Sequence, residues 1–326
     1  MLPNPDYARR PPFEEALRQV SDADRAAAWT AFAEAFEDAR RSWAVAPKPD
    51  LAATRPGAIG AKLAEFQQNG FAVFRIDPRR KAEIVRLAEP ALDMVRESMA
   101  SATGKVKFAD GAAWLDPKDN RALYALVAEA LEDCGALPVA NIYSRATLAF
   151  DLYAQINTAE RTTGKWGPID KDGLPREKSA YWHVDSNIYP PAKMLIYLNE
   201  VGRKQGPFRY IAGSHLAMDE REALIRKTND KLRFQPIQFM ALPEEFRLHA
   251  LFGDHLDRDS DAVRSLLAKE RAVFSEDGDV SLFDNHGVHR GGFVRDGVRE
   301  ILQVLLEPVR ASKPKEHAPK AEAVEA

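Results

Sequence analysis

The hydrophobic period of this chain changes near residue 147, and that change limits the folds it can adopt. Before this point, apolar residues recur mainly at helical spacing. From Thr147 they alternate with polar residues: Phe150, Leu152, Ala154 and Ile156 on one face of a strand, and Asp151, Tyr153, Gln155 and Asn157 on the other. Strand-like segments then cluster in the second half. We therefore expect an α+β fold, with a strand-rich barrel or sandwich buttressed by N-terminal helices.

Local signals place the first elements. One or two helices are expected within 12–45, with Asp22 or Asp24 as the cap residue. A short helix over 62–70 should end at Gly70, followed by a strand over 71–76. Asp77 should then cap a helix that runs to about Met99, and residues 120–135 should form another.

The later segments divide into strands and one long insertion. Strands are predicted over 193–199, within 205–215, over 280–283 and over 299–306. Residues 216–272 should be a mainly helical insertion, a lid or a dimer surface, whose last helix runs over about 260–272. The domain organisation is then a helical extension over 1–59, a main domain over 60–310 that contains the insertion, and a disordered tail over 311–326.

Composition narrows the function classes. The 326 residues carry a net charge of −3, so no global field favours nucleic acid or an anionic membrane surface. No window reaches the roughly 18 apolar residues that a membrane span needs. A single cysteine excludes an internal disulfide, and the N-terminus lacks a basic region followed by an apolar run. We expect a cytoplasmic protein that acts on a small molecule, with a homodimer left open.

The segment 180–187 offers a candidate metal site. His183 and Asp185 are two residues apart, so on an extended strand both side chains point to the same face. The alternative is a strand-end pair that faces solvent. His286 and His289 both follow the strand at 280–283 and are candidates for a third ligand. Two histidines and one carboxylate suit non-haem Fe(II) and oxygen chemistry, because three coordination positions stay open.

Arg299 adds a second signal. It lies ten residues after His289 and follows Gly297, so a tight turn would bring it back beside the metal. Its guanidinium could hold the distal carboxylate of 2-oxoglutarate through two parallel hydrogen bonds. The alternative is a surface ion pair with Glu300 or Asp296. Another histidine, His215, is expected to cap a strand end rather than bind metal.

Four segments in order resemble the phytanoyl-CoA dioxygenase (PhyH) family of Fe(II)/2-oxoglutarate-dependent oxygenases: 65–74, 181–186, 206–215 and 289–299. The resemblance implies a double-stranded β-helix, a cupin-like jelly roll. It implies that His183, Asp185 and His289 bind Fe(II) and that Arg299 binds 2-oxoglutarate. The implied reaction uses O2 to hydroxylate an aliphatic C–H of a small molecule, with succinate and CO2 as co-products. A carboxylate at Asp185 favours hydroxylation over halogenation.

The same resemblance suggests the neighbours of the metal. Tyr153, Asn187 and Tyr189 would contact the substrate. Relatives often carry a serine where this chain has Gly291, so the co-substrate contact would come from Gln155 or Tyr197. Two other functions stay open: a cupin-like metalloenzyme that does not use 2-oxoglutarate, and a non-catalytic jelly-roll binding protein.

Overall fold

The computed structural model describes residues 20–42, 57–100, 112–158, 185, 191–216, 264–265 and 267–309. Its helices are α2 (Asp22–Ser42), α3 (Ala58–Asn69), α4 (Pro78–Ala100), α5 (Arg121–Asp133) and α6 (Ala136–Ser144). Its strands are β1 (Phe71–Phe74), β2 (Ala112–Leu115), β3 (Leu148–Thr158), β4 (Ala192–Tyr197), β5 (Phe208–Ile211), β6 (Glu270–Val273), β7 (Val280–Asp284), β8 (His289–Arg290) and β9 (Val298–Pro308).

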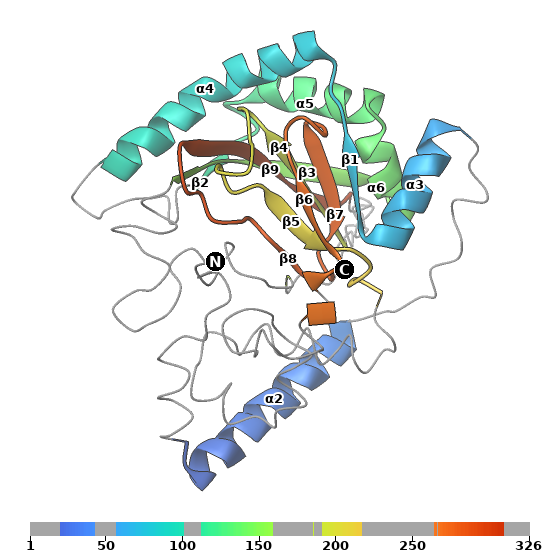
Figure 1. The fold of residues 1–326 in the computed structure, drawn as a ribbon, viewed down its shortest axis with the longest axis vertical. Helices are drawn as coiled ribbons and strands as arrows, with labels where there is room; N and C mark the ends of the chain where they lie inside the picture. Colours follow the sequence, from blue (N-terminus) through green and yellow to red (C-terminus); the bar gives the residue numbers. More distant parts are fainter. Residues whose placement is uncertain are drawn as a thin grey trace, which may run out of the picture.

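The described strands form two antiparallel sheets (Figure 1). The larger has six strands in the order β1-β7-β4-β9-β3-β2, and the smaller has three in the order β6-β5-β8. The long strands β3 and β9 pair over their full length, from Leu148 opposite Pro308 to Thr158 opposite Val298. The expected combination of helices with antiparallel strands is confirmed.

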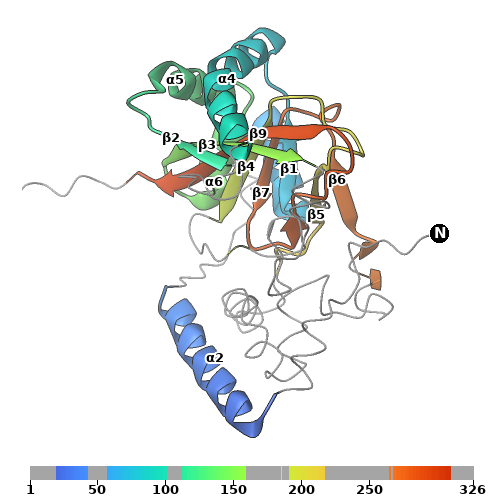
Figure 2. The same cartoon turned by 90° about the vertical axis from the view of Figure 1, so that its left-hand side faces the viewer.

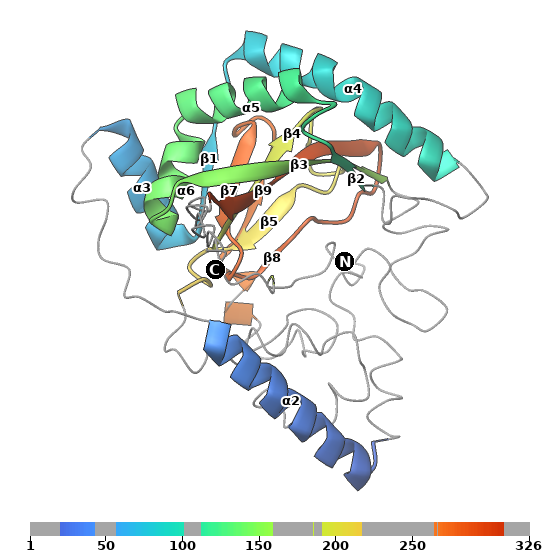
Figure 3. The same cartoon turned by 180° about the vertical axis from the view of Figure 1, so that it is seen from behind.

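Helices cover one face of the six-stranded sheet. Figures 2 and 3 show α4 and α5 lying across this face, with α6 beside them. The alternate residues of β3 that point this way, Leu152, Ala154 and Ile156, are at most 2% exposed and join the main hydrophobic core. The period-two pattern of the sequence therefore corresponds to one face packed under helices and one face turned toward the smaller sheet.

A second apolar cluster lies between the two sheets. Phe208 of β5 packs against Phe283 of β7 with ring centroids 4.6 Å apart, and Tyr197 and Ile301 belong to the same cluster. Residues that oppose one another on paired strands share a face, so the register identifies the side chains that enter this space. The interior between the sheets is where the predicted metal site would have to form.

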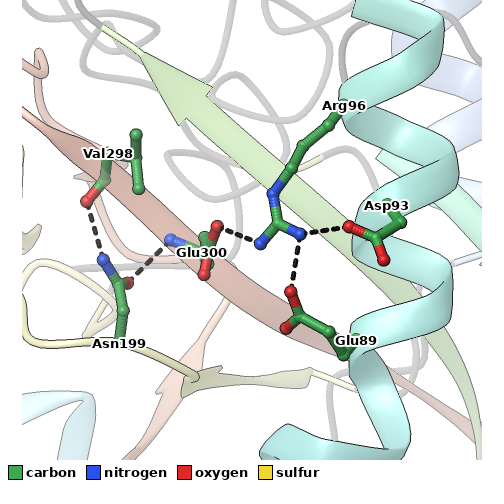
Figure 4. Close-up of polar contacts among 6 residues, drawn as sticks. All are labelled: Glu89, Asp93, Arg96, Asn199, Val298 and Glu300. Atoms are coloured by element: carbon green, nitrogen blue, oxygen red, sulfur yellow. Dashed lines mark hydrogen bonds and ion pairs between the residues drawn. The ribbon is translucent and has the colours of Figure 1, made fainter.

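An ion-pair network fixes α4 on the larger sheet (Figure 4). The Arg96 guanidinium lies 2.7 Å from Glu89 and 2.6 Å from Asp93 on its own helix, and 2.7 Å from Glu300 on β9. The backbone N–H of Glu300 in turn donates to the side chain of Asn199, at 2.9 Å. Helix, central strand and the loop after β4 are thereby joined at one point.

Two local predictions are confirmed at atomic detail. Gly70 ends α3 in the left-handed conformation, with φ of 80°, and its N–H donates to the Phe66 carbonyl. Asp77 caps α4, since its carboxylate accepts from the backbone N–H groups of Arg79 and Arg80 at 3.0 and 3.2 Å. Both signals depend only on residues within one helical turn.

Two local predictions are wrong in detail. Ser21, rather than Asp22 or Asp24, caps α2: its hydroxyl accepts from the Asp24 N–H, and the Asp24 carboxylate accepts from the Ser21 N–H, as in a capping box. The helix expected to reach Ala272 has ended by residue 270, because 270–273 form β6 and pair with β5. Pairing with a neighbouring strand here overrides the helical propensity of Lys, Glu, Arg and Ala.

Other predictions fall on residues outside the described ranges. These are the loop over 159–179, the tail over 311–326, and most of the extension over 1–59 and of the insertion over 216–272. The described helix of the extension, α2, lies apart from the sheets in Figures 1 and 2. Among the described helices, we find none long and apolar enough to span a membrane.

Candidate metal centre

Asp185 and His289 come together although more than a hundred residues separate them. The His289 Nε2 atom lies 3.8 Å from Oδ2 of Asp185. His289 is 4% exposed, whereas Asp185 is partly accessible. An imidazole nitrogen and a carboxylate oxygen, both of types that can bind a metal ion, therefore lie near each other at β8.

The His289 ring is held in one orientation. Its Nδ1 lies 2.9 Å from the Gly287 carbonyl, so in the neutral ring Nδ1–H donates there and the Nε2 lone pair is directed toward Asp185. Phe283 packs against the ring with centroids 4.8 Å apart, and Tyr210 stacks on it with an interplanar angle of 13°. A carbonyl that fixes the tautomer is the usual partner of a metal-binding histidine.

Asp284 organises the turn that leads to His289 and that contacts Asp185. Its buried carboxylate accepts from the Tyr143 hydroxyl at 2.5 Å and from the His286 backbone N–H at 2.9 Å. The next carbonyl, that of Asn285, accepts from the Asp185 N–H at 2.9 Å. Burial, and then the Asp284 charge, raise the pKa of Tyr143, so its hydroxyl stays protonated as the donor. Neither Tyr143 nor Asp284 was predicted as part of the site.

Lys193 is a further site residue that sequence reasoning missed. Its ammonium lies 2.5 Å from Oδ2 of Asp185. Lys193 opposes Phe283 across β4 and β7, so both side chains enter the space between the sheets. The signal was a charged residue at an inward position of the otherwise apolar strand 193–197. This contact orients the carboxylate and adds a positive charge beside it.

Arg299 enters the same interior and is 4% exposed. It opposes Asn157 across β3 and β9, and its Nη2 donates to the Asn157 side chain at 3.0 Å. Its Nη1 donates to the Gly206 carbonyl and, at 3.5 Å, to that of Gly292. Burial excludes the alternative, a surface ion pair of Arg299; Glu300 pairs with Arg96 and Asp296 with Lys204.

Glycine is required where Arg299 is anchored. Gly206 has a φ of 66°, and a Cβ there would lie 2.7 Å from the carbonyl carbon of Phe293. A Cβ on Gly292 would lie 2.6 Å from the Pro207 carbonyl oxygen. The two backbone segments can approach this closely only without side chains. That approach brings both carbonyls to the guanidinium.

Three further residues predicted to contact the co-substrate or the substrate, Tyr197, Gln155 and Tyr153, differ in burial and in hydrogen-bond partners. The Tyr197 hydroxyl donates to the Val273 carbonyl and accepts from the Phe208 N–H, each at 2.8 Å; burial raises its pKa to about 12. Gln155 is 5% exposed, and its side-chain oxygen accepts from Gln303 of β9. Tyr153, two residues earlier on the same face, is half-buried.

The remaining candidate residues divide as follows. His183, Asn187 and Tyr189 lie outside the described residues. Within the described part of the chain, no group of three or more His, Cys, Asp or Glu could hold a metal ion. The ring of His286 lies 3.3 Å from the Asp284 carboxylate. His215 contacts the Gln67 carbonyl at 2.9 Å, at the end of α3.

Comparison with known proteins gives remote structural likenesses. No protein-family model and no curated protein matches the chain. AviO1 from Streptomyces viridochromogenes Tue57 is 15% identical with a TM-score of 0.44, over 80% of this chain and 99% of that one. The non-heme alpha ketoglutarate dependent carbocyclase SnoK from nogalamycin biosynthesis is 16% identical with a TM-score of 0.43, over 78% and 85%.

EctD from S. alaskensis, solved with 2-oxoglutarate and 5-hydroxyectoine, is 14% identical with a TM-score of 0.45, over 76% of each chain. At such identities and TM-scores, the function has to be argued from this chain's own residues. The expected membership of the phytanoyl-CoA dioxygenase family stays a prediction.

Proposed function

We propose that this protein is an Fe(II)/2-oxoglutarate-dependent dioxygenase with a cupin-like double-stranded β-helix, which hydroxylates an aliphatic C–H of a small molecule. The observation that carries the proposal is the convergence of His289 and Asp185, 3.8 Å apart, between two facing antiparallel sheets. Iron bound there would supply the oxygen chemistry, with 2-oxoglutarate converted to succinate and CO2.

The donor set fits Fe(II). His289 offers Nε2 and Asp185 offers its carboxylate, which Fe(II) would share with the ammonium of Lys193. We propose His183, two residues before Asp185, as the third ligand. One carboxylate and two neutral imidazoles leave three coordination positions for 2-oxoglutarate and O2. The carboxylate of Asp185 fills the position that a halide would need in a halogenase, which favours hydroxylation.

Arg299 is proposed to bind the distal carboxylate of 2-oxoglutarate. Its guanidinium is buried, which strengthens a charge-assisted hydrogen bond, and Gly206, Gly292 and Asn157 hold it in place. Phe208, Phe283 and Ile301 belong to the buried apolar cluster of the same interior.

Substrate and co-substrate contacts are assigned by position in this interior. We propose Gln155 as the residue that makes the contact missing at Gly291. The Tyr197 hydroxyl already bonds to Val273 and Phe208, so its ring would border the co-substrate. Tyr153, Asn187 and Tyr189 are proposed to contact the substrate.

The first test is spectroscopic. Anaerobic addition of Fe(II) and 2-oxoglutarate to the apo-protein should produce a weak visible metal-to-ligand band. Asp185→Ala, His289→Ala and His183→Ala should abolish it, because each removes a ligand. His286→Asn should retain it, because His286 contacts Asp284 instead. A wild-type protein without the band contradicts the proposal, as does a band that persists in all three alanine variants. Loss of the band in His286→Asn together with its retention in His289→Ala would make His286 the ligand in place of His289.

A substitution at Arg299 distinguishes the proposed dioxygenase from a cupin-like metalloenzyme that does not use 2-oxoglutarate. Arg299→Gln should keep Fe(II) binding and lose the band with 2-oxoglutarate, with circular dichroism to check that the buried substitution leaves the fold intact. If activity survives this change, the protein is a cupin-like metalloenzyme that does not use 2-oxoglutarate. Succinate release stimulated by members of a compound panel would identify the substrate class and exclude a purely binding role.

A further inference from the structure

The outer face of the three-stranded sheet carries a pocket separate from the candidate metal centre. Tyr210 and His289 oppose each other on β5 and β8 and face the interior. Their strand neighbours Arg209 and Arg290, which also oppose each other, therefore point to the opposite face. They line a pocket of about 360 Å³ there.

Two of the lining arginines are built into the sheet. Arg290 is 2% exposed, and its Nη2 lies 3.8 Å from the Glu270 carboxylate. Arg209 forms an ion pair with the same carboxylate. Glu270 of β6 thus contacts both guanidiniums that line the pocket.

Two more arginines stand at the rim. Arg203 comes from the loop between β4 and β5, and Arg295 from the segment between β8 and β9; both are exposed. A backbone hydrogen bond of 2.7 Å from the Arg295 N–H to the Lys204 carbonyl joins these two segments. Four guanidiniums from four positions in the chain therefore surround one cavity.

We propose that this pocket binds a small molecule that carries a phosphate or several carboxylates. Guanidinium groups match the paired oxygens of both, and a buried guanidinium strengthens such bonds. Phe274 and Phe293 supply apolar walls for the rest of the ligand. The volume lies at the lower end of the range, about 300–1,000 Å³, of small-molecule sites.

This site differs from the proposed co-substrate site. The backbone of Gly206 lies between them: it lines the pocket on one side, and its carbonyl accepts from Arg299 on the other. An anion bound at Arg209 and Arg290 is therefore separated from the interior by the three-stranded sheet.

Calorimetric titration tests the proposal, with pyrophosphate as the phosphate probe and citrate as the carboxylate probe. The full chain is used in low-salt buffer without metal or 2-oxoglutarate, so the result does not depend on the iron site. Binding of only one probe shows whether the site prefers phosphates or carboxylates. Binding of both supports general recognition of anionic oxygens by the guanidinium groups. Absence of binding by either overturns the proposal.

A pair of charge-matched variants locates the binding. R203Q/R295Q removes two exposed rim arginines and should weaken binding at least tenfold. R79Q/R121Q removes two exposed arginines from the starts of α4 and α5, away from the pocket, and should change it less than twofold. Equal weakening in both variants would mean that net charge alone attracts the anion, which contradicts a site.

Discussion

At the scale of single residues, buried polar groups carry the candidate site. His289, Asp284 and Arg299 are each at most 4% exposed, and each has an identified hydrogen-bond partner. Because leaving a buried polar group without its partner costs about 1–3 kcal/mol, such residues are fixed in one arrangement. Substitutions at the supporting residues should therefore be measurable as changes in stability.

Tyr143→Phe should destabilise the protein by about 1–3 kcal/mol, since the buried Asp284 carboxylate loses its hydroxyl donor. Urea denaturation measures this change. Tyr153→Phe, at a half-buried tyrosine of β3, is the matched control and should stay within about 0.5 kcal/mol of the wild type. Equal effects of the two substitutions would contradict the role given to Tyr143.

Tyr197 should make stability fall at alkaline pH. Its pKa rises from 10.0 to about 12 because of burial, so the folded state retains a proton that the unfolded state loses between these values. Its contribution is complete below pH 10 and is lost as the pH rises toward 12. Between pH 9 and pH 11, the wild type should lose about 1 kcal/mol more than Tyr197→Phe. Denaturation curves of both proteins at the two pH values test this, and parallel losses would refute it.

At the scale of elements, the close approach of two backbone segments anchors Arg299. Gly206→Ala should destabilise the protein by more than about 2 kcal/mol, because its Cβ would meet the Phe293 backbone at a positive φ. Gly57→Ala is the control: its φ is 89°, but no atom lies within 4 Å of the added Cβ, so only backbone strain of about 1–2 kcal/mol is expected. Thermal or urea unfolding that ranks Gly57→Ala as the more damaging change would oppose this explanation.

The contact between α4 and β9 depends on Arg96 (Figure 4). Arg96→Gln should cost about 1 kcal/mol: the network joins three carboxylates, but Arg96 is 38% exposed, so solvent screens part of it. Arg86→Gln on the same helix breaks only the exposed pair with Glu83 and should cost less than about 0.5 kcal/mol. A double-mutant cycle of Arg96 with Glu300 measures the interaction free energy between these two residues, which is the part of the network that joins α4 to β9.

At the scale of the whole molecule, metal binding should stabilise the fold, because the proposed ligands belong to segments far apart in the chain. Mn(II), a redox-inert substitute, should raise Tm, and the rise should increase with metal concentration. Adding 2-oxoglutarate should raise Tm further in the wild type but not in Arg299→Gln. Asp185→Asn should remove the response to Mn(II), and a response that persists in this variant would place the metal elsewhere.

The sequence by itself determined the features that depend on near neighbours. Gly70 and Asp77 were predicted as helix boundaries because caps act within one turn, and the alternation over 148–158 predicted β3 because its period follows from strand geometry. Asp185 was chosen with His183 because residues two apart on a strand share a face, and His289 because it follows the predicted strand 280–283.

Only the tertiary structure decided which distant groups meet. Residues 270–273 read locally as helix, yet they form β6 because β5 offers its backbone groups for pairing. Arg290 reached Glu270 because their strands, β8 and β6, both pair with β5, and no local pattern encodes these registers. Short-range propensity is worth a few tenths of a kcal/mol per residue, whereas burial and pairing across the fold are worth several times more.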